Sequence, residues 1–109
     1  MALTHVGPRE VVSLSAKDSE LIAERTTALV KAGNFELIRI VLPATKTIAE
    51  HSVAGPIVLL CLEGLVKITT RGGAALMLGA DDLVHLEPST PHALEAIEDS
   101  RLLLTVVFV

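Results

Sequence analysis

The sequence predicts an all-β domain, a small barrel or sandwich built from short strands. Glycine and proline divide the chain at frequent intervals into pieces of strand length. These pieces are rich in aliphatic and β-branched residues, and 50% of all residues are hydrophobic. Many short strands separated by closely spaced turns are typical of a sandwich or barrel.

The beginning of the chain has the least regular pattern. Residues 1–10 are predicted to form an arm, and residues 11–14 a short strand. Residues 17–24 are predicted to form a short helical turn, because polar residues could cap its start and a Leu-Ile pair gives it an apolar side. We therefore divide the chain into an N-terminal arm, residues 1–10, and one barrel domain, residues 11–109.

From residue 26 onward, the spacing of glycine and proline is typical of a β protein. A glycine-containing loop at residues 31–34 joins the first two strands as a hairpin, and Pro43 ends the second of them. Glu63 and Gly64 form a tight turn between two later strands. The predicted strands are residues 26–30, 35–42, 57–62, 65–70, 75–78, 82–86, 93–96 and 102–108.

Two of these strands are apolar on both faces. Side chains alternate between the faces of a strand, and residues 57–62 are apolar at every position. Residues 102–109 are apolar at every position except Thr105. A small barrel buries one face of each strand, and a monomer rarely leaves so large an apolar patch exposed. We therefore expect a homodimer through sheet faces, with Leu60 and Val107 near the centre of such faces.

Composition excludes several classes of partner. The net charge is −4 and the sequence holds no Lys/Arg cluster, so a nucleic-acid partner is not expected. The longest apolar run is far shorter than the roughly 20 residues of a membrane-spanning helix. The single cysteine, Cys61, excludes an intrachain disulfide, and the start of the chain lacks the pattern of a signal peptide. These observations predict a protein of the reducing cytoplasm.

Two segments contain candidate site residues. The first runs from His51 to Gly64 and ends in Leu-Glu-Gly; the second runs from Asp82 through a proline-containing turn to His92. They resemble the two sequence motifs of small RmlC-like cupins, and with the spacing between them the resemblance covers roughly residues 45–96, about half of the chain. The resemblance implies a jelly-roll barrel, also called a double-stranded β-helix, with both histidines at its mouth.

The same resemblance raises the question of a metal cofactor. Cupins typically hold one metal ion with two histidines and a glutamate of the first motif and one histidine of the second. His51 and His92 match the first and last of these positions, but Val53 stands at the second histidine position and Ile57 at the glutamate position. The resemblance thus implies at most a weak, incomplete site for a divalent transition metal, and a protein without a cofactor is the alternative.

Further residues complete the predicted ligand-binding set. We expect residues 45–55 and 87–91 to frame one open end of the barrel, with the two histidine rings close together and Val53 and Ile57 closing the floor. Arg39 lies on the same face as three apolar residues of its strand. If that face is interior, its guanidinium requires an anionic partner, which a small carboxylate or phosphate ligand could supply. The alternative is that it faces solvent or pairs with an acid of a neighbouring strand.

Three functions remain open at this point, and the sequence does not decide whether the chain is an enzyme. The first is a binding module that captures a small polar metabolite in the barrel mouth. The second is a cupin-type enzyme, an oxygenase, isomerase or decarboxylase, in which a metal or the general base His51 or His92 is catalytic. The third is a structural role for the dimer. The fold does not choose among these, whereas the two replaced ligand positions favour the binding module.

Overall fold

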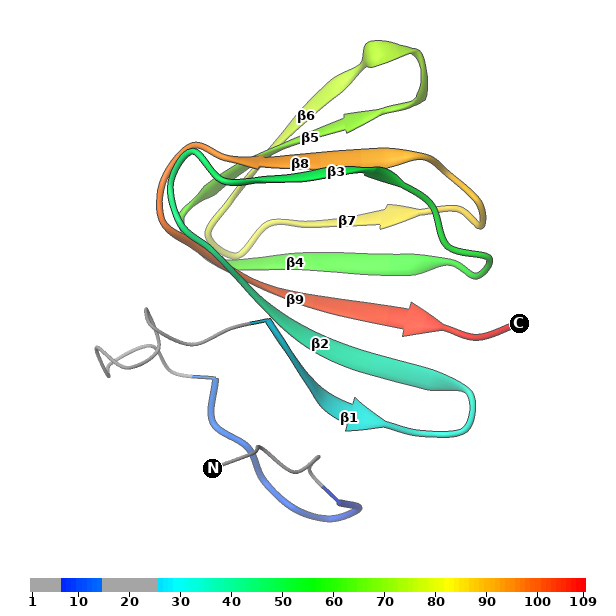
Figure 1. Ribbon diagram of the computed structural model, residues 1–109. Helices are drawn as coiled ribbons and strands as arrows, with labels where there is room; N and C mark the ends of the chain where they lie inside the picture. Colours follow the sequence, from blue (N-terminus) through cyan, green and yellow to red (C-terminus); the bar gives the residue numbers. More distant parts are fainter. Residues whose placement is uncertain (1–6, 15–25) are drawn as a thin grey trace.

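The computed structural model describes residues 7–14 and 26–109, and its strands all lie in the second range. Within the described residues the regular structure is nine strands and one short 3₁₀ helix, which confirms the all-β class (Figure 1). Here no helix is long and apolar enough to cross a membrane. The elements are β1 (Thr27–Lys31), β2 (Phe35–Leu42), β3 (Thr47–His51), β4 (Ile57–Glu63), β5 (Leu65–Thr70), η1 (Arg71–Gly73), β6 (Ala75–Gly79), β7 (Leu83–Leu86), β8 (His92–Ala96) and β9 (Ser100–Val107).

The strands form two antiparallel sheets. One has five strands in the order β1-β2-β9-β4-β7, and the other has four in the order β3-β8-β5-β6. From β2 onward the chain repeatedly crosses from one sheet to the other, so most neighbouring strands are distant in sequence, as β2 and β9 are. Two facing sheets connected in this way form a jelly roll.

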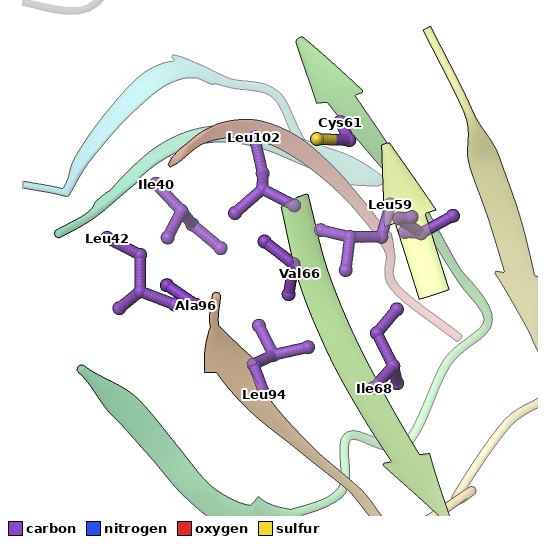
Figure 2. Close-up of a cluster of buried hydrophobic side chains, with 10 residues drawn as sticks. Ile40, Leu42, Leu59, Cys61, Val66, Ile68, Leu94, Ala96 and Leu102 are labelled. Atoms are coloured by element: carbon purple, nitrogen blue, oxygen red, sulfur yellow. The ribbon is translucent and has the colours of Figure 1, made fainter. Parts of the chain in front are cut away.

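The core lies between the sheets and takes its residues from both of them (Figure 2). Every second residue of each strand points inward, and burial alternates accordingly along β4, β5 and β8. Burying one such aliphatic side chain contributes about 1.5–3 kcal/mol. The buried cluster consists of Ile40, Leu42, Leu59, Cys61, Val66, Ile68, Leu78, Leu94, Ala96 and Leu102.

The outer faces of the two sheets differ in polarity. On the four-stranded sheet, Lys67 and Glu95 form an ion pair of 3.4 Å, as expected for a face in water. On the five-stranded sheet, Leu103 of β9 is paired with Leu60 of β4, which is paired with Leu83 of β7. Leu83 is 61% exposed and the other two are only partly buried. The outer face of the five-stranded sheet therefore carries a row of leucines, which continues into Arg39 of β2.

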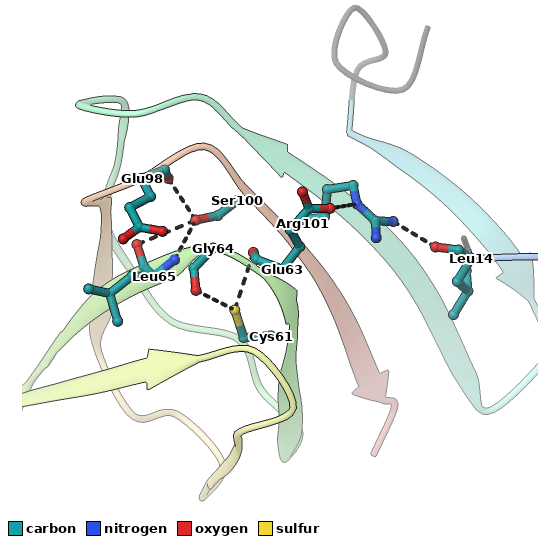
Figure 3. A network of polar contacts seen from close by, with 8 residues as sticks. All are labelled: Leu14, Cys61, Glu63, Gly64, Leu65, Glu98, Ser100 and Arg101. Carbon is teal, nitrogen blue, oxygen red and sulfur yellow. Dashed lines mark hydrogen bonds and ion pairs between the residues drawn. The ribbon is translucent and has the colours of Figure 1, made fainter. Parts of the chain in front are cut away.

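The turn between β4 and β5 is packed against the start of β9 (Figure 3). The backbone N–H of Leu65 donates to the Ser100 hydroxyl oxygen at 3.1 Å, and that hydroxyl donates to the Glu98 carbonyl at 2.7 Å. Next to it, the Arg101 guanidinium donates to the Glu63 carboxylate at 2.9 Å and to the Leu14 carbonyl at 2.7 Å. These contacts attach residues 7–14 to the five-stranded sheet.

The predictions for residues 1–25 concern a strand, a helical turn and the domain bounds. The strand predicted at residues 11–14 is wrong: this segment is irregular, and Val11 is 97% exposed because no neighbouring strand pairs with it. The predicted helical turn, residues 17–24, lies outside the described residues. The domain bounds at residues 10 and 11 stay a prediction.

No strand was predicted at β3, Thr47–His51. It is an edge strand in which Ile48 alone is partly buried, while Thr47 and the three residues after Ile48 are exposed. An exposed edge strand does not need the alternation of apolar and polar residues that signals a strand in a sequence. Its last residue is His51, so this strand positions a candidate site residue.

Candidate functional site

Strands β3 and β8 bring the two predicted histidines together. His51 ends β3, His92 begins β8, and the two are register partners. Their ring centroids are 4.4 Å apart, with the ring planes tilted by 56°. His92 is only 4% exposed, whereas His51 is exposed. The expectation that the rings lie close together is confirmed, and the pair extends from the interior to the surface.

An irregularity in β3 explains why both rings share one face of the sheet. Ile48 pairs with Leu94 and His51 pairs with His92, so three steps along β3 match two steps along β8. The extra residue is a β-bulge, and a bulge reverses the side to which the following side chains point. Without it, Glu50 instead of His51 would share the inner face with Ile48. The bulge therefore brings His51 against His92.

Backbone hydrogen bonds fix the tautomer of both imidazoles. The Nδ1–H of His51 donates to the Ala49 carbonyl at 3.0 Å, and the Nδ1–H of His92 donates to the Thr90 carbonyl at 2.9 Å. A carbonyl only accepts, so Nδ1 carries the proton of each neutral ring. Each Nε2 then has a free lone pair, which can accept a hydrogen bond, accept a proton or bind a metal.

A cavity of about 470 Å³ opens beside His51. It lies where β2 begins and β9 ends, next to the segment that follows β3, at the end of the domain where Figure 1 shows the C-terminus. The backbone N–H of Ser89 donates to the Val53 carbonyl at 2.8 Å, which ties the loop before β8 to this rim. Of the predicted frame, residues 87–91 and the end of residues 45–55 lie here, while Thr45 bonds to Ala96 at the other end of β8.

The three other predicted ligand-binding residues lie in different places. Val53 lines the cavity. Ile57 is 3% exposed and does not line it, but it is paired with Val106, which does. Arg39 does not reach the cavity: its neighbour Ile38 lines it, and successive side chains of a strand point to opposite faces. Of the two positions considered, Arg39 therefore lies on the outer side of β2, where its side chain is nevertheless only 6% exposed.

The donor set does not fit a cupin metal centre. The two histidine rings lie together, but the other two ligand positions of the cupin motif hold the aliphatic residues Val53 and Ile57. Among the described residues, no group of three or more His, Cys, Asp or Glu side chains could hold a metal ion. A catalytic first-row metal site usually has three protein ligands, so two imidazoles are one short.

Sequence reasoning missed Glu36. This residue lies between two apolar neighbours near the start of β2, and its half-buried side chain lines the cavity together with His51. A glutamate in a strand reads as a surface residue, and the sequence contains no signal that would have singled it out.

Comparisons with known proteins identify the fold. No family model matches the sequence, and no curated protein matches it significantly. Among solved structures, a cupin superfamily protein from Desulfitobacterium hafniense matches with a TM-score of 0.79 and 17% identity, over 100% of both chains. An RmlC-like cupin protein from Desulfovibrio desulfuricans matches with a TM-score of 0.76 and 20% identity, over 89% of this chain and 95% of the other.

A third structure, a conserved protein of unknown function from Streptococcus pyogenes, matches with a TM-score of 0.74 and 24% identity, over 100% of this chain and 98% of the other. The chain therefore has the RmlC-like cupin fold, as the two motif segments predicted. At these identities the likeness concerns the fold, and the function has to be argued from the site.

Proposed function

We propose that this chain binds a small metabolite at the mouth of its barrel, with a polar group of the ligand at His51, the exposed member of the histidine pair. The cavity beside His51 carries the proposal. Its volume of about 470 Å³ is in the range of small-molecule sites, and its walls are mostly apolar with few polar groups. Such a site suits a ligand with an apolar body and a polar end.

The state of the histidines supports binding without a metal. Both Nδ1–H groups are held by backbone carbonyls, so the Nε2 atoms are already oriented before a ligand arrives. Val53 and Ile57 supply apolar surface where a cupin metal centre needs two further ligands. The site is built to accept hydrogen bonds from a ligand.

A metabolite screen by thermal unfolding tests the proposal. A ligand at 100 times its Kd adds about 2.7 kcal/mol of stability, which raises the Tm of a domain of this size by about 10 °C or more. We expect His51→Ala to abolish that shift and His85→Ala to retain it, because His85 is also exposed but lies on the outer face of β7. A shift of equal size in both variants would contradict the assignment of the site.

A His-based enzyme is the second candidate function, and the tautomers favour it. An unprotonated Nε2 on His51 or His92 can take a proton from a bound substrate as a general base. Following a ligand identified in the screen by NMR over hours separates the two functions. Product signals that vanish in His92→Gln support an enzyme, and an unchanged ligand supports a binding module.

We also propose that the biological unit is a homodimer that covers the outer face of the five-stranded sheet. The row of Leu83, Leu60 and Leu103 on this outer face supports it, because an exposed row of leucines favours a cover. A second copy is a self-complementary cover for such a face. The unpaired buried thiol of Cys61 accords with a reducing compartment such as the cytoplasm.

A further inference from the structure

The polar groups of the cavity define which ligands it can satisfy. Among the described residues, the lining contains one charged side chain, the carboxylate of Glu36, and one imidazole, that of His51. Its other members are glycine, alanine and larger aliphatic or aromatic residues. No lysine or arginine of the described chain lines this space, and Arg39 lies on the opposite face of β2.

Both polar groups are hydrogen-bond acceptors. An ionised carboxylate only accepts. The Nδ1–H of His51 is already donated to the Ala49 carbonyl, so in the neutral ring Nε2 is an acceptor too. The ligand must therefore supply the donors.

The Glu36 carboxylate makes no close polar contact with another side chain in the described protein. It is half-buried on the inner face of β2, and its side chain forms no ion pair or hydrogen bond within residues 7–14 and 26–109. Its two partners in the sheet ladder are Lys31 and Val106, whose side chains share its face of the sheet; Val106 lines the cavity and Lys31 does not. A cation in the cavity would complement this carboxylate through a charge-assisted hydrogen bond.

We propose that the cavity selects small organic cations, namely amines protonated at neutral pH, over anions and neutral molecules of the same shape. The ammonium group donates to the Glu36 carboxylate and to Nε2 of His51, while the apolar body packs on Ile38, Leu104 and Val106. This inference rests on the proposed binding function and adds the charge of the ligand. Carboxylates and phosphates would meet a like charge in the cavity.

Three probes with one carbon skeleton test the selectivity: cyclohexylmethylamine, cyclohexylmethanol and cyclohexanecarboxylate. Each is titrated into full-length protein labelled at the methyl groups of Ile, Leu and Val, and the shifts of the cavity methyl signals are fitted to a Kd. We expect the amine to bind about tenfold or more tightly than the alcohol, because hydrogen bonds to charged groups are the stronger ones. The carboxylate should bind most weakly of the three.

Glu36→Gln provides the decisive variant, with Glu95→Gln as its control. Both substitutions remove one negative charge, but Glu95 lies on the outer face of the four-stranded sheet. We expect Glu36→Gln to reduce the preference for the amine over the alcohol to near unity and Glu95→Gln to leave it unchanged. Because the preference is a ratio measured on one protein, a general loss of stability does not imitate it, and the methyl spectrum reports whether the variant is folded.

The outcomes separate this inference from the proposed function. Equal binding of amine and alcohol, or a preference for the carboxylate, overturns the charge selectivity while the cavity remains a binding site. An amine preference that survives Glu36→Gln overturns the role of Glu36. If no probe saturates the shifts of the cavity methyl signals at millimolar concentration, both the charge selectivity and the proposed binding function are overturned.

Discussion

Four glycine-to-alanine substitutions separate backbone strain from steric overlap in the turns of the barrel. Gly33 has an ordinary φ and open space around an added Cβ, and Gly72 has a φ of +85° with open space. Gly55 has an ordinary φ, but its Cβ would lie 1.8 Å from the backbone oxygen of Val107. Gly64 combines both problems, with a φ of +96° and a Cβ 2.3 Å from the hydroxyl oxygen of Ser100.

These geometries predict a ranking of destabilisation. Gly33→Ala is expected to be neutral or to stabilise by about 0.4–1 kcal/mol, because alanine restricts the unfolded chain. Gly72→Ala costs about 1–2 kcal/mol for a left-handed alanine. Gly55→Ala costs about 1–3 kcal/mol, since a backbone atom cannot rotate away as a side chain can. Gly64→Ala sums strain and overlap to about 2–5 kcal/mol.

Urea unfolding at 25 °C measures each free energy, with the slope m checking that the unfolded state is unchanged. If Gly55→Ala is as harmless as Gly33→Ala, the rim of the cavity does not approach β9 as closely as the structure has it. If Gly64→Ala costs no more than Gly72→Ala, the packing of the turn against Ser100 is refuted. Gly55→Ala should also weaken binding of the amine probe, because Gly55 lines the cavity.

Three further predictions concern the metal positions, the dimer and the thiol. Val53→His with Ile57→Glu should complete a four-ligand site with the two histidines and raise zinc affinity sharply by calorimetry; no gain would mean that the backbone departs from the cupin site geometry. Leu60→Asp should convert a dimer of 11.5 kDa chains into monomers in sedimentation, whereas Thr69→Asp on the polar sheet should not, and a monomeric wild type would refute the dimer. Burial raises the pKa of the Cys61 thiol, so iodoacetamide should modify it only on unfolding. Because the unfolded thiol loses its proton at a lower pH, the free energy of unfolding should fall as pH rises above about 8.5, and Cys61→Ala should remove that fall.

The fold could be predicted because its signals are local. Turn residues such as Gly64 and Pro43 mark the strand ends, and the apolar runs between them have the length of strands. Strands β2 and β5 were predicted with their observed bounds, Phe35–Leu42 and Leu65–Thr70. Strand β3 escaped prediction because an exposed edge strand leaves no apolar pattern in the sequence.

The histidine pair was predicted from the motif resemblance, but its geometry could not be. Strict alternation places His51 on the face opposite to Ile48, which is the outer face. The bulge that reverses this depends on the pairing of β3 with β8, and that pairing joins residues that are distant in sequence. The tautomers follow from the same local backbone, because each imidazole donates to the carbonyl two residues before it.

The sign of the charge in the cavity could not be predicted from the sequence. Strand β2 carries apolar residues on both of its faces, so the sequence cannot tell which face is interior, and that choice decides whether Arg39 or Glu36 enters the site. Only the stacking of the four-stranded sheet on one side of β2 makes the choice, and it places Ile38 and Glu36 at the cavity and Arg39 outside. If Arg39 lined the cavity, a carboxylate or phosphate ligand would be expected. Because the fold instead places the carboxylate of Glu36 in the cavity, beside the imidazole of His51, we expect an amine.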